Sequence, residues 1–280
     1  MSIAIVTDST ACLDPADAGH EGISVVPLKV VIGEETFIEG CGISGDDIAA
    51  ALKAKKPVST SRPTPEEFQE LYESLAADGA DEIVSIHLSP KVSGTLDAAI
   101  VAGKRASIPV TVVDSTTIGL ATGFAAGRAA RARDAGGAAS SMAAAARSAG
   151  EASTTLFYVD TLEYLRRGGR VTTVGAFVGS ALAVKPILAV RDGAVVPLER
   201  VRTSAKAMSR LQALAVAACM EADHGFDIGV QHLAARPAAQ KFAQKLALAL
   251  GLERIAVDEI SAVIGAHTGP GTVSVSLTPR

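Results

Sequence analysis

Four short polar segments carry the side chains of this protein that could bind an anion or take part in catalysis. They combine hydroxyl, glycine, arginine and histidine residues, and each lies beside a stretch with strand or helix character. The segments are residues 59–63, 89–95, 165–170 and 265–272. In a parallel sheet, loops at the carboxyl ends of the strands surround the ligand crevice. We therefore expect these segments to contribute to one site.

Two of the segments are rich in hydroxyl groups. Ser93-Gly94-Thr95 stands where a helix is expected to begin, so its backbone N–H groups and the helix dipole favour an anion. The same residues also suit an ordinary N-cap. Thr60 and Ser61 could donate hydroxyls to the same anion, or simply form a polar turn before the next proline.

The other two segments supply a cation and an imidazole. Arg170 follows two glycines and could hold a carboxylate through two charge-assisted hydrogen bonds, or belong to a solvated basic turn. His267 precedes Thr-Gly-Pro-Gly and is either a ligand donor or a structural turn residue. Because no second histidine stands at metal-ligand spacing, we expect no metal site.

A serine hydrolase is an alternative function. Ser93, His267 and either Asp8 or Asp114 could in principle form a nucleophilic triad. However, Ser93 lies in Val-Ser-Gly-Thr, which lacks the G-x-S-x-G pattern of a nucleophile elbow. The chain also lacks a G-x-G-x-x-G after the first apolar run and a G-x-x-x-x-G-K-[ST] anywhere, so we expect no nucleotide cofactor.

The composition restricts the class of protein. With 280 residues, 48% of them hydrophobic, the chain is long enough for two medium domains. A net charge of −4 and the absence of Trp disfavour nucleic-acid binding. No apolar run reaches the roughly 18–20 residues of a membrane span, so we expect no stable membrane insertion. No sustained heptads appear, which favours a monomer.

The cysteines and the N-terminus predict the compartment. Cys12, Cys41 and Cys219 are odd in number and contain no C-x-x-C, so neither a disulfide framework nor a zinc site is expected. The first residues lack the basic start and cleavage site of a signal peptide. We therefore expect a cytoplasmic protein.

The first half of the chain alternates short apolar runs with helical patterns. We predict strands near residues 2–6, 24–31, 82–87 and 110–113. Helices are expected near 46–53, 64–77 and 94–106, followed by a long alanine-rich helical region; Thr64-Pro65-Glu66-Glu67 opens the second as a cap, a first-turn proline and an acidic turn. This alternation predicts a parallel, doubly wound α/β domain over residues 1–152.

The pattern changes in the second half. Strands are predicted near residues 154–159, 184–190, 195–201, 226–231, 255–260 and 272–277, with helices near 203–219 and 236–250. Asp192-Gly193 is a strong hairpin signal between two of the strands. We therefore predict a smaller α+β domain with a mostly antiparallel sheet over residues 153–280.

Nine segments, taken in order, resemble the DegV family of fatty-acid-binding proteins. They are VTDST, VVPLKVVIGEETFIEG, TSRPTPEEF, SPKVSGTLDAA, VVDSTTIGLATG, VDTLEYLRRGGRV, LAVKPIL, DGAVVPLERVRT and IGAHTGPGT. The resemblance extends from the first predicted strand to the last polar segment. Any one of these strings is weak evidence, whereas nine in the order of the family are strong evidence.

The resemblance implies a long-chain fatty acid held between two domains, with its carboxylate near the polar segments. The carboxylate contacts of the family map onto Thr60 or Ser61, Ser93 with Gly94, Arg170 and His267. It also implies a non-catalytic lipid-binding protein of phospholipid metabolism, similar to the subunit that presents the acyl chain to an ATP-dependent fatty acid kinase. From the residues alone, a module for another anionic small molecule stays open as an alternative.

Two positions depart from the family pattern. Cys12 stands where the first loop of the family usually carries an acidic residue, which puts the local role of that loop in doubt. Leu233 follows Gln231-His232, where the family often has a small residue and a glycine. Neither position lies in the four polar segments.

Overall fold

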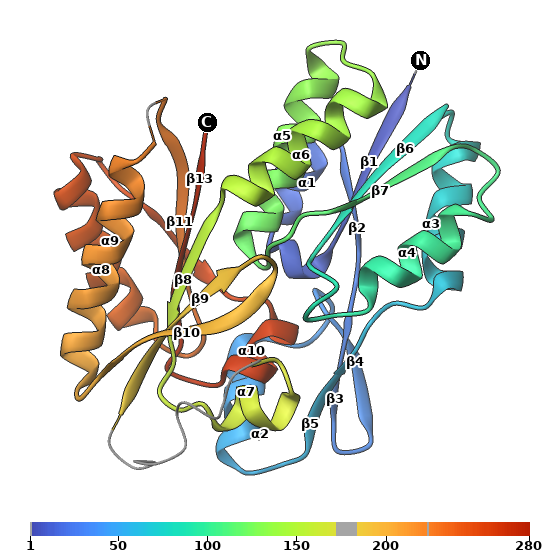
Figure 1. Ribbon diagram of the computed structural model, residues 1–280. Helices are drawn as coiled ribbons and strands as arrows, with labels where there is room; N and C mark the ends of the chain where they lie inside the picture. Colours follow the sequence, from blue (N-terminus) through green and yellow to red (C-terminus); the bar gives the residue numbers. More distant parts are fainter. Residues whose placement is uncertain (1, 172–183, 223) are drawn as a thin grey trace.

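The first sheet is parallel and buried on both faces. The computed structural model describes residues 2–171, 184–222 and 224–280 (Figure 1). The first sheet has the order β2-β1-β6-β7, and every neighbouring pair is parallel. Its strands are β1 (Ile3–Asp8), β2 (Ile23–Val26), β6 (Glu82–His87) and β7 (Val110–Asp114). This confirms the predicted parallel sheet.

Helices cover both faces of this sheet. Alternate residues of a strand point to opposite faces, so Val6 packs with Phe68 and Tyr72, while Ile5 packs with Met142. The first face is covered by α3 (Pro65–Ala77) and α4 (Thr95–Gly103), the second by α5 (Leu120–Asp134) and α6 (Ala139–Ala152). The predicted cap of α3 is confirmed, because the Thr64 side chain accepts from Glu67 N and Glu67 reaches back to Thr64 N.

The second sheet has six strands in the order β10-β9-β8-β13-β11-β12. All neighbouring pairs are antiparallel except β11 with β12, as predicted for a mostly antiparallel sheet. The strands are β8 (Thr154–Tyr158), β9 (Lys185–Arg191), β10 (Ala194–Val201), β11 (Phe226–His232), β12 (Ala256–Glu259) and β13 (Val273–Pro279). Helices α8 (Ser204–Met220) and α9 (Arg236–Leu250) cover its outer face, and α5 and α6 lie between the two sheets (Figure 1).

A third sheet was missing from the sequence prediction. Its strands are β3 (Lys29–Ile32), β4 (Glu35–Ile38) and β5 (Val58–Ser61), in the antiparallel order β4-β3-β5, with α2 (Gly45–Lys53) between β4 and β5. The single strand predicted over residues 24–31 is wrong, because β2 ends at Val26 and β3 begins at Lys29. Pro27 stands in the break, where its lack of an N–H interrupts a ladder.

The three-stranded sheet packs against the second half of the chain. Val30 and Ile48 share one buried cluster with Leu233, Val263 and Ala266. The last two belong to α10 (Ala262–Thr268), a short helix in a region predicted to be a loop. The division of the chain at residue 152 falls at the end of α6, and as a boundary between domains it stays a prediction.

The predicted hairpin between β9 and β10 is confirmed. Asp192 and Gly193 have φ values of 49° and 75°, as a tight turn with two left-handed residues requires. A Cβ atom on Gly193 would lie 2.1 Å from Ser89 Oγ, so only glycine permits this turn to pack against the loop after β6.

The remaining short helices are η1 (Ser9–Ala11), α1 (Pro15–His20) and α7 (Glu163–Gly168). Among the described helices, none is both long and apolar enough to cross a membrane.

Candidate functional site

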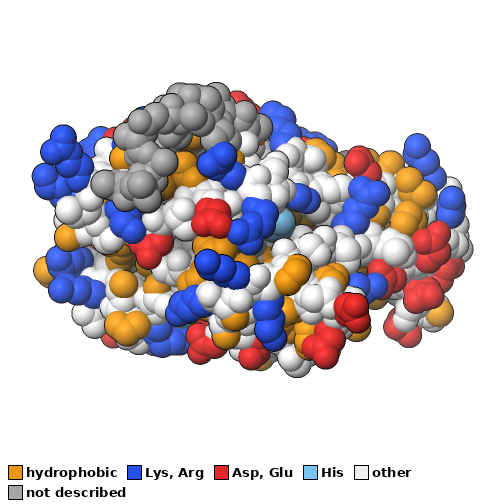
Figure 2. Space-filling model, turned by 90° about the horizontal axis from the view of Figure 1, so that it is seen from below, with side chains coloured by type: hydrophobic (Ala, Val, Ile, Leu, Met, Phe, Trp, Pro, Cys, Tyr) orange, Lys and Arg blue, Asp and Glu red, His pale blue; other side chains and the backbone are white. Residues whose placement is uncertain are grey.

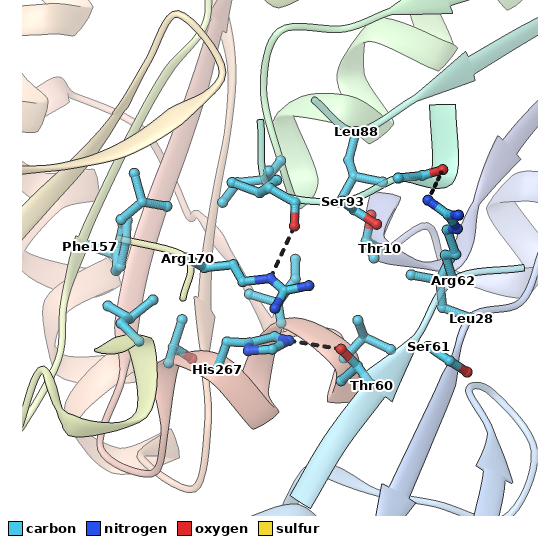
Figure 3. Close-up of a pocket in the computed structure, with 18 residues that line it drawn as sticks. Thr10, Leu28, Thr60, Ser61, Arg62, Leu88, Ser93, Phe157, Arg170 and His267 are labelled. Carbon is cyan, nitrogen blue, oxygen red and sulfur yellow. Dashed lines mark hydrogen bonds between the residues drawn. The ribbon is translucent and has the colours of Figure 1, made fainter. Parts of the chain in front are cut away.

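A cavity of about 330 Å³ lies where the three sheets approach one another (Figure 3). All six residues predicted to bind the ligand line it: Thr60, Ser61, Ser93, Gly94, Arg170 and His267. They come from β5, from the loop before α4, from the residues after α7 and from α10. The fold therefore brings together four segments that are far apart in the sequence.

Thr60 and His267 form the best-defined polar pair of the cavity. Thr60 Oγ1 lies 2.8 Å from His267 Nε2. The imidazole is also fixed from the opposite side, because a Cβ atom on Gly168 would lie 2.2 Å from His267 Nδ1. Burial, and after it the nearby Arg170 charge, lowers the pKa of His267 to about 4. The imidazole is therefore neutral near pH 7.

This lowered pKa predicts a pH dependence of stability. The unfolded chain, with a histidine pKa near 6.5, takes up the proton before the folded chain does as the pH falls. We expect His267 to contribute a loss of up to about 3 kcal/mol in the free energy of unfolding between roughly pH 6.5 and pH 4. Urea unfolding across this range, compared with His267→Gln, isolates the contribution, because other buried groups such as His232 are common to both proteins. If the free energy of unfolding falls equally with pH in the wild type and in His267→Gln, the lowered pKa of His267 is contradicted.

Arg170 joins two segments at the mouth of the cavity. Its Nε donates to the Val92 carbonyl at 3.2 Å, and its Nη1 donates to the Gly168 carbonyl. Figure 3 shows the guanidinium between Ser93 and His267. A half-buried guanidinium in this place offers charge-assisted donors to a carboxylate.

Ser93 and Gly94 form the loop that leads into α4. Ser93 Oγ lies 2.9 Å from Thr95 Oγ1, and Gly94 is the N-cap residue of α4. The Arg62 side chain covers Gly94, and a Cβ atom there would lie 1.7 Å from Arg62 Nη1. Arg62 also lines the cavity and was not among the predicted site residues. Its place directly after Ser61 was the only sequence signal for it.

The triad considered for a hydrolase is not assembled. Ser93 Oγ pairs with Thr95, and His267 Nε2 pairs with Thr60, within the described part of the chain. Asp8 instead lies 2.9 Å from His87 Nδ1, in a fully buried network. Asp114 accepts from the Thr116 N–H at 2.7 Å, in the turn after β7.

Apolar side chains form most of the remaining cavity wall, and the sequence did not identify them. They come from all parts of the fold: Leu28, Leu88, Val92, Ile118, Phe157, Leu165, Val195, Val263 and Ile264. A smaller pocket of about 20 Å³ adjoins the cavity and shares four residues with it, Ile118, Phe157, Ile264 and Thr268. The site therefore combines a polar end with a long apolar side.

A buried carboxylate holds α10 in place beside the cavity. Glu39 Oε1 accepts from Ser261 Oγ at 2.7 Å and from Val263 N at 3.0 Å. Its Oε2 accepts from Ser9 Oγ, whose oxygen in turn accepts from Leu28 N at 2.9 Å. Glu39 thus connects both halves of the chain to the helix that carries the imidazole.

The two departures from the family pattern lie outside this cavity. Burial raises the pKa of the Cys12 thiol to about 12, and the thiol donates to the Thr10 carbonyl at 3.1 Å. It therefore stays protonated near pH 7 and is a poor nucleophile. Leu233 is buried in the cluster that joins the three-stranded sheet to α10.

Comparisons with known proteins identify the family of this chain. A family model described as "Uncharacterised protein, DegV family" matches residues 2–280. A DegV domain-containing protein of Streptomyces coelicolor is 48% identical, with 99% of each chain covered, and protein DegV of Bacillus subtilis is 35% identical, with 98% of each covered.

Two solved structures of the family superpose over the whole chain. One, from Thermus thermophilus, is described by its fatty acid binding; it has a TM-score of 0.92, 31% identity and 100% coverage of both chains. The other is DegV of Bacillus subtilis, described as a fatty acid binding protein, with a TM-score of 0.90, 32% identity and 100% coverage of both chains. The protein belongs to the DegV family.

Proposed function

We propose that this protein binds a long-chain fatty acid in the 330 Å³ cavity and presents it to a separate kinase. The observation that carries the proposal is the form of the cavity: the Thr60–His267 pair and Arg170 at one end, and an apolar wall along the rest. Its volume falls within the range of about 300–1,000 Å³ that is usual for small-molecule sites. The fatty-acid binding of the relatives from Thermus thermophilus and Bacillus subtilis supports the same ligand.

The apolar wall supplies most of the binding free energy. Burying about 14 methylene groups at ~0.8 kcal/mol each would give roughly 11 kcal/mol before other terms. Loss of rigid-body motion and ordering of the acyl chain offset several kcal/mol of this gain. Micromolar or tighter binding follows. A short carboxylate or phosphate would use only the polar end and would bind more weakly.

The polar end replaces the water lost by the carboxylate. The Thr60 and Ser93 hydroxyls and the Arg170 guanidinium can donate to its oxygens, whereas Ser61, the next residue on β5, is exposed and its hydroxyl points away from them (Figure 3). His267, neutral near pH 7, can donate from Nε2 to Thr60 Oγ1 and so leave the Thr60 hydroxyl free to donate to the carboxylate. A negative group held this way keeps one face toward the mouth of the cavity.

Ser93, His267 and Asp8 or Asp114 do not form a nucleophilic triad. Presentation to a kinase would let the protein take part in acyl phosphate formation without one. In the kinase, a carboxylate oxygen of the fatty acid attacks the γ-phosphorus of ATP. The bond from that phosphorus to the ADP oxygen breaks, ADP leaves with the electron pair, and an acyl phosphate forms. The present chain contributes binding, orientation and burial of the tail, while the kinase contributes the nucleotide and its Mg²⁺.

The proposal is tested with the palmitate-loaded protein, ATP, Mg²⁺ and a bacterial fatty acid kinase. Hydroxylamine trapping of the acyl phosphate should give palmitoyl hydroxamate only when chain, kinase and ATP are all present. Hydroxamate formation by the chain and ATP alone would contradict a non-catalytic role. Turnover of activated esters by the chain, lost in Ser93→Ala, would favour the hydrolase instead.

A further inference from the structure

A second cavity, of about 170 Å³, adjoins the acyl cavity and shares three residues with it. Thr60, Arg170 and His267 line both. The Thr60–His267 hydrogen bond therefore lies between a largely apolar chamber and a second, more polar one. The residues that line only the second cavity are Leu52, Val58, Ser59, Tyr164, Arg167, Gly168 and Ala266.

The charge of the second cavity is positive. Among its described lining residues, Arg167 and Arg170 are cationic and none is acidic. Arg167 is held over the Tyr164 ring, with Cζ 5.9 Å from the ring centroid, and is paired on its other side with Glu163 of the preceding turn. The chain that leads from Leu52 to Val58 adds three exposed lysines, Lys53, Lys55 and Lys56.

The donor set of this cavity suits a tetrahedral oxyanion. Guanidinium groups match the spacing of phosphate oxygens and bind them through paired hydrogen bonds. Thr60 on β5 adds a hydroxyl donor. Figure 2 shows the molecule from below, the side on which α2, α7 and α10 lie in Figure 1; Lys and Arg side chains gather over the middle of this face, with a few acidic ones among them. Arg167 and the three lysines are exposed, so the surface beside this cavity is basic.

We propose that the second cavity is a phosphoryl site, which holds the phosphate of the acyl phosphate product while the acyl chain stays in the first cavity. The inference rests on the proposed function. The anhydride oxygen that joins the acyl carbon to phosphorus would lie beside the Thr60–His267 pair. Arg170, which lines both cavities, would contact the carboxylate before transfer and the phosphoryl group after it. A fatty acid without the phosphoryl group would make no contact with Arg167, which then keeps only its pair with Glu163 and its place over the Tyr164 ring.

The test compares two ligands with the same acyl chain. Palmitate is one, and the other is its acylphosphonate, in which carbon is bonded directly to phosphorus so that hydrolysis is prevented. Titration calorimetry on the full-length protein should show that Arg167→Gln weakens acylphosphonate binding by about tenfold. The same substitution should leave palmitate affinity within about twofold, because Arg167 does not line the acyl cavity.

Arg166→Gln is the matched control, since Arg166 is an exposed residue of the same helix and lines neither cavity. It should change the affinity of neither ligand, which excludes a general effect of surface charge. If palmitate binds but Arg167→Gln affects both ligands equally or neither, the phosphoryl site is wrong and the fatty-acid site stands. If the wild-type protein fails to bind palmitate, the proposed function itself fails.

Discussion

Glutamine in place of Arg170 is expected to weaken palmitate binding by about 10- to 150-fold. A charge-assisted hydrogen bond to a half-buried carboxylate contributes about 1.5–3 kcal/mol, and each 1.4 kcal/mol is a factor of ten in the dissociation constant. The substitution also removes the donors to the Val92 and Gly168 carbonyls, so the mouth of the cavity loses a connection. Arg170→Lys keeps the positive charge but loses the planar, two-pronged donor group. Its affinity for palmitate should lie between those of the wild type and Arg170→Gln.

Two controls separate binding from folding in this experiment. Arg166→Gln makes the same chemical change outside the cavity and should bind palmitate as the wild type does. Urea unfolding of the ligand-free variants shows whether Arg170→Gln acts through stability. A folded Arg170→Gln protein that binds palmitate with wild-type affinity would remove Arg170 from the carboxylate site.

Alanine in place of Asp8 should lower the free energy of unfolding by about 3–5 kcal/mol. The Asp8 carboxylate is fully buried; it accepts from Thr10 N at 3.1 Å and from Leu88 N at 3.3 Å, and lies 2.9 Å from His87 Nδ1. His87 Nε2 continues the network to Ser85, whose hydroxyl also accepts from Tyr72. Removing the carboxylate leaves several buried polar groups without partners.

Asp14→Ala is the control for this loss. Asp14 caps α1 from an exposed position, with Ala16 N donating to it at 2.8 Å. Loss of such a cap lowers stability by about 1 kcal/mol. Urea unfolding gives the free energy of unfolding of each variant, and the values are compared when both variants show the same dependence on urea concentration. A loss in Asp8→Ala no larger than that in Asp14→Ala would show that the buried network is not a major source of stability.

Thr10 and Leu88 line the acyl cavity, so a destabilised Asp8→Ala protein should also bind fatty acid less tightly.

The sequence predicted the two large sheets because their strands have distinct local patterns. Buried parallel strands such as β1 begin with a continuous apolar run, and the Asp192-Gly193 turn specifies its hairpin by local backbone preference. The three-stranded sheet was not predicted because each of its strands has only four residues, and β4 and β5 include exposed positions. β5 consists of Val-Ser-Thr-Ser, whose polarity indicates a turn; pairing with β3 makes it a strand.

The polar half of the site was predicted, whereas its apolar half was not. Residues such as Arg170 and His267 stand out because glycines and prolines surround them, and the family resemblance assigns them to one site. Leu28, Phe157 and Val263 look like any other core residue in the sequence, and only the tertiary fold shows that they face a cavity. Glu39 gave no signal either, because its three partners lie 30 to 224 residues away.

Native mass spectrometry of the protein, purified gently from its expression host, tests the central claim most directly. The account predicts a dominant species heavier than the apoprotein by the mass of one long-chain fatty acid. Organic extraction should release that acid in nearly equimolar yield, and Arg170→Gln should carry less of it. A homogeneous apoprotein that also fails to take up added palmitate would contradict the account.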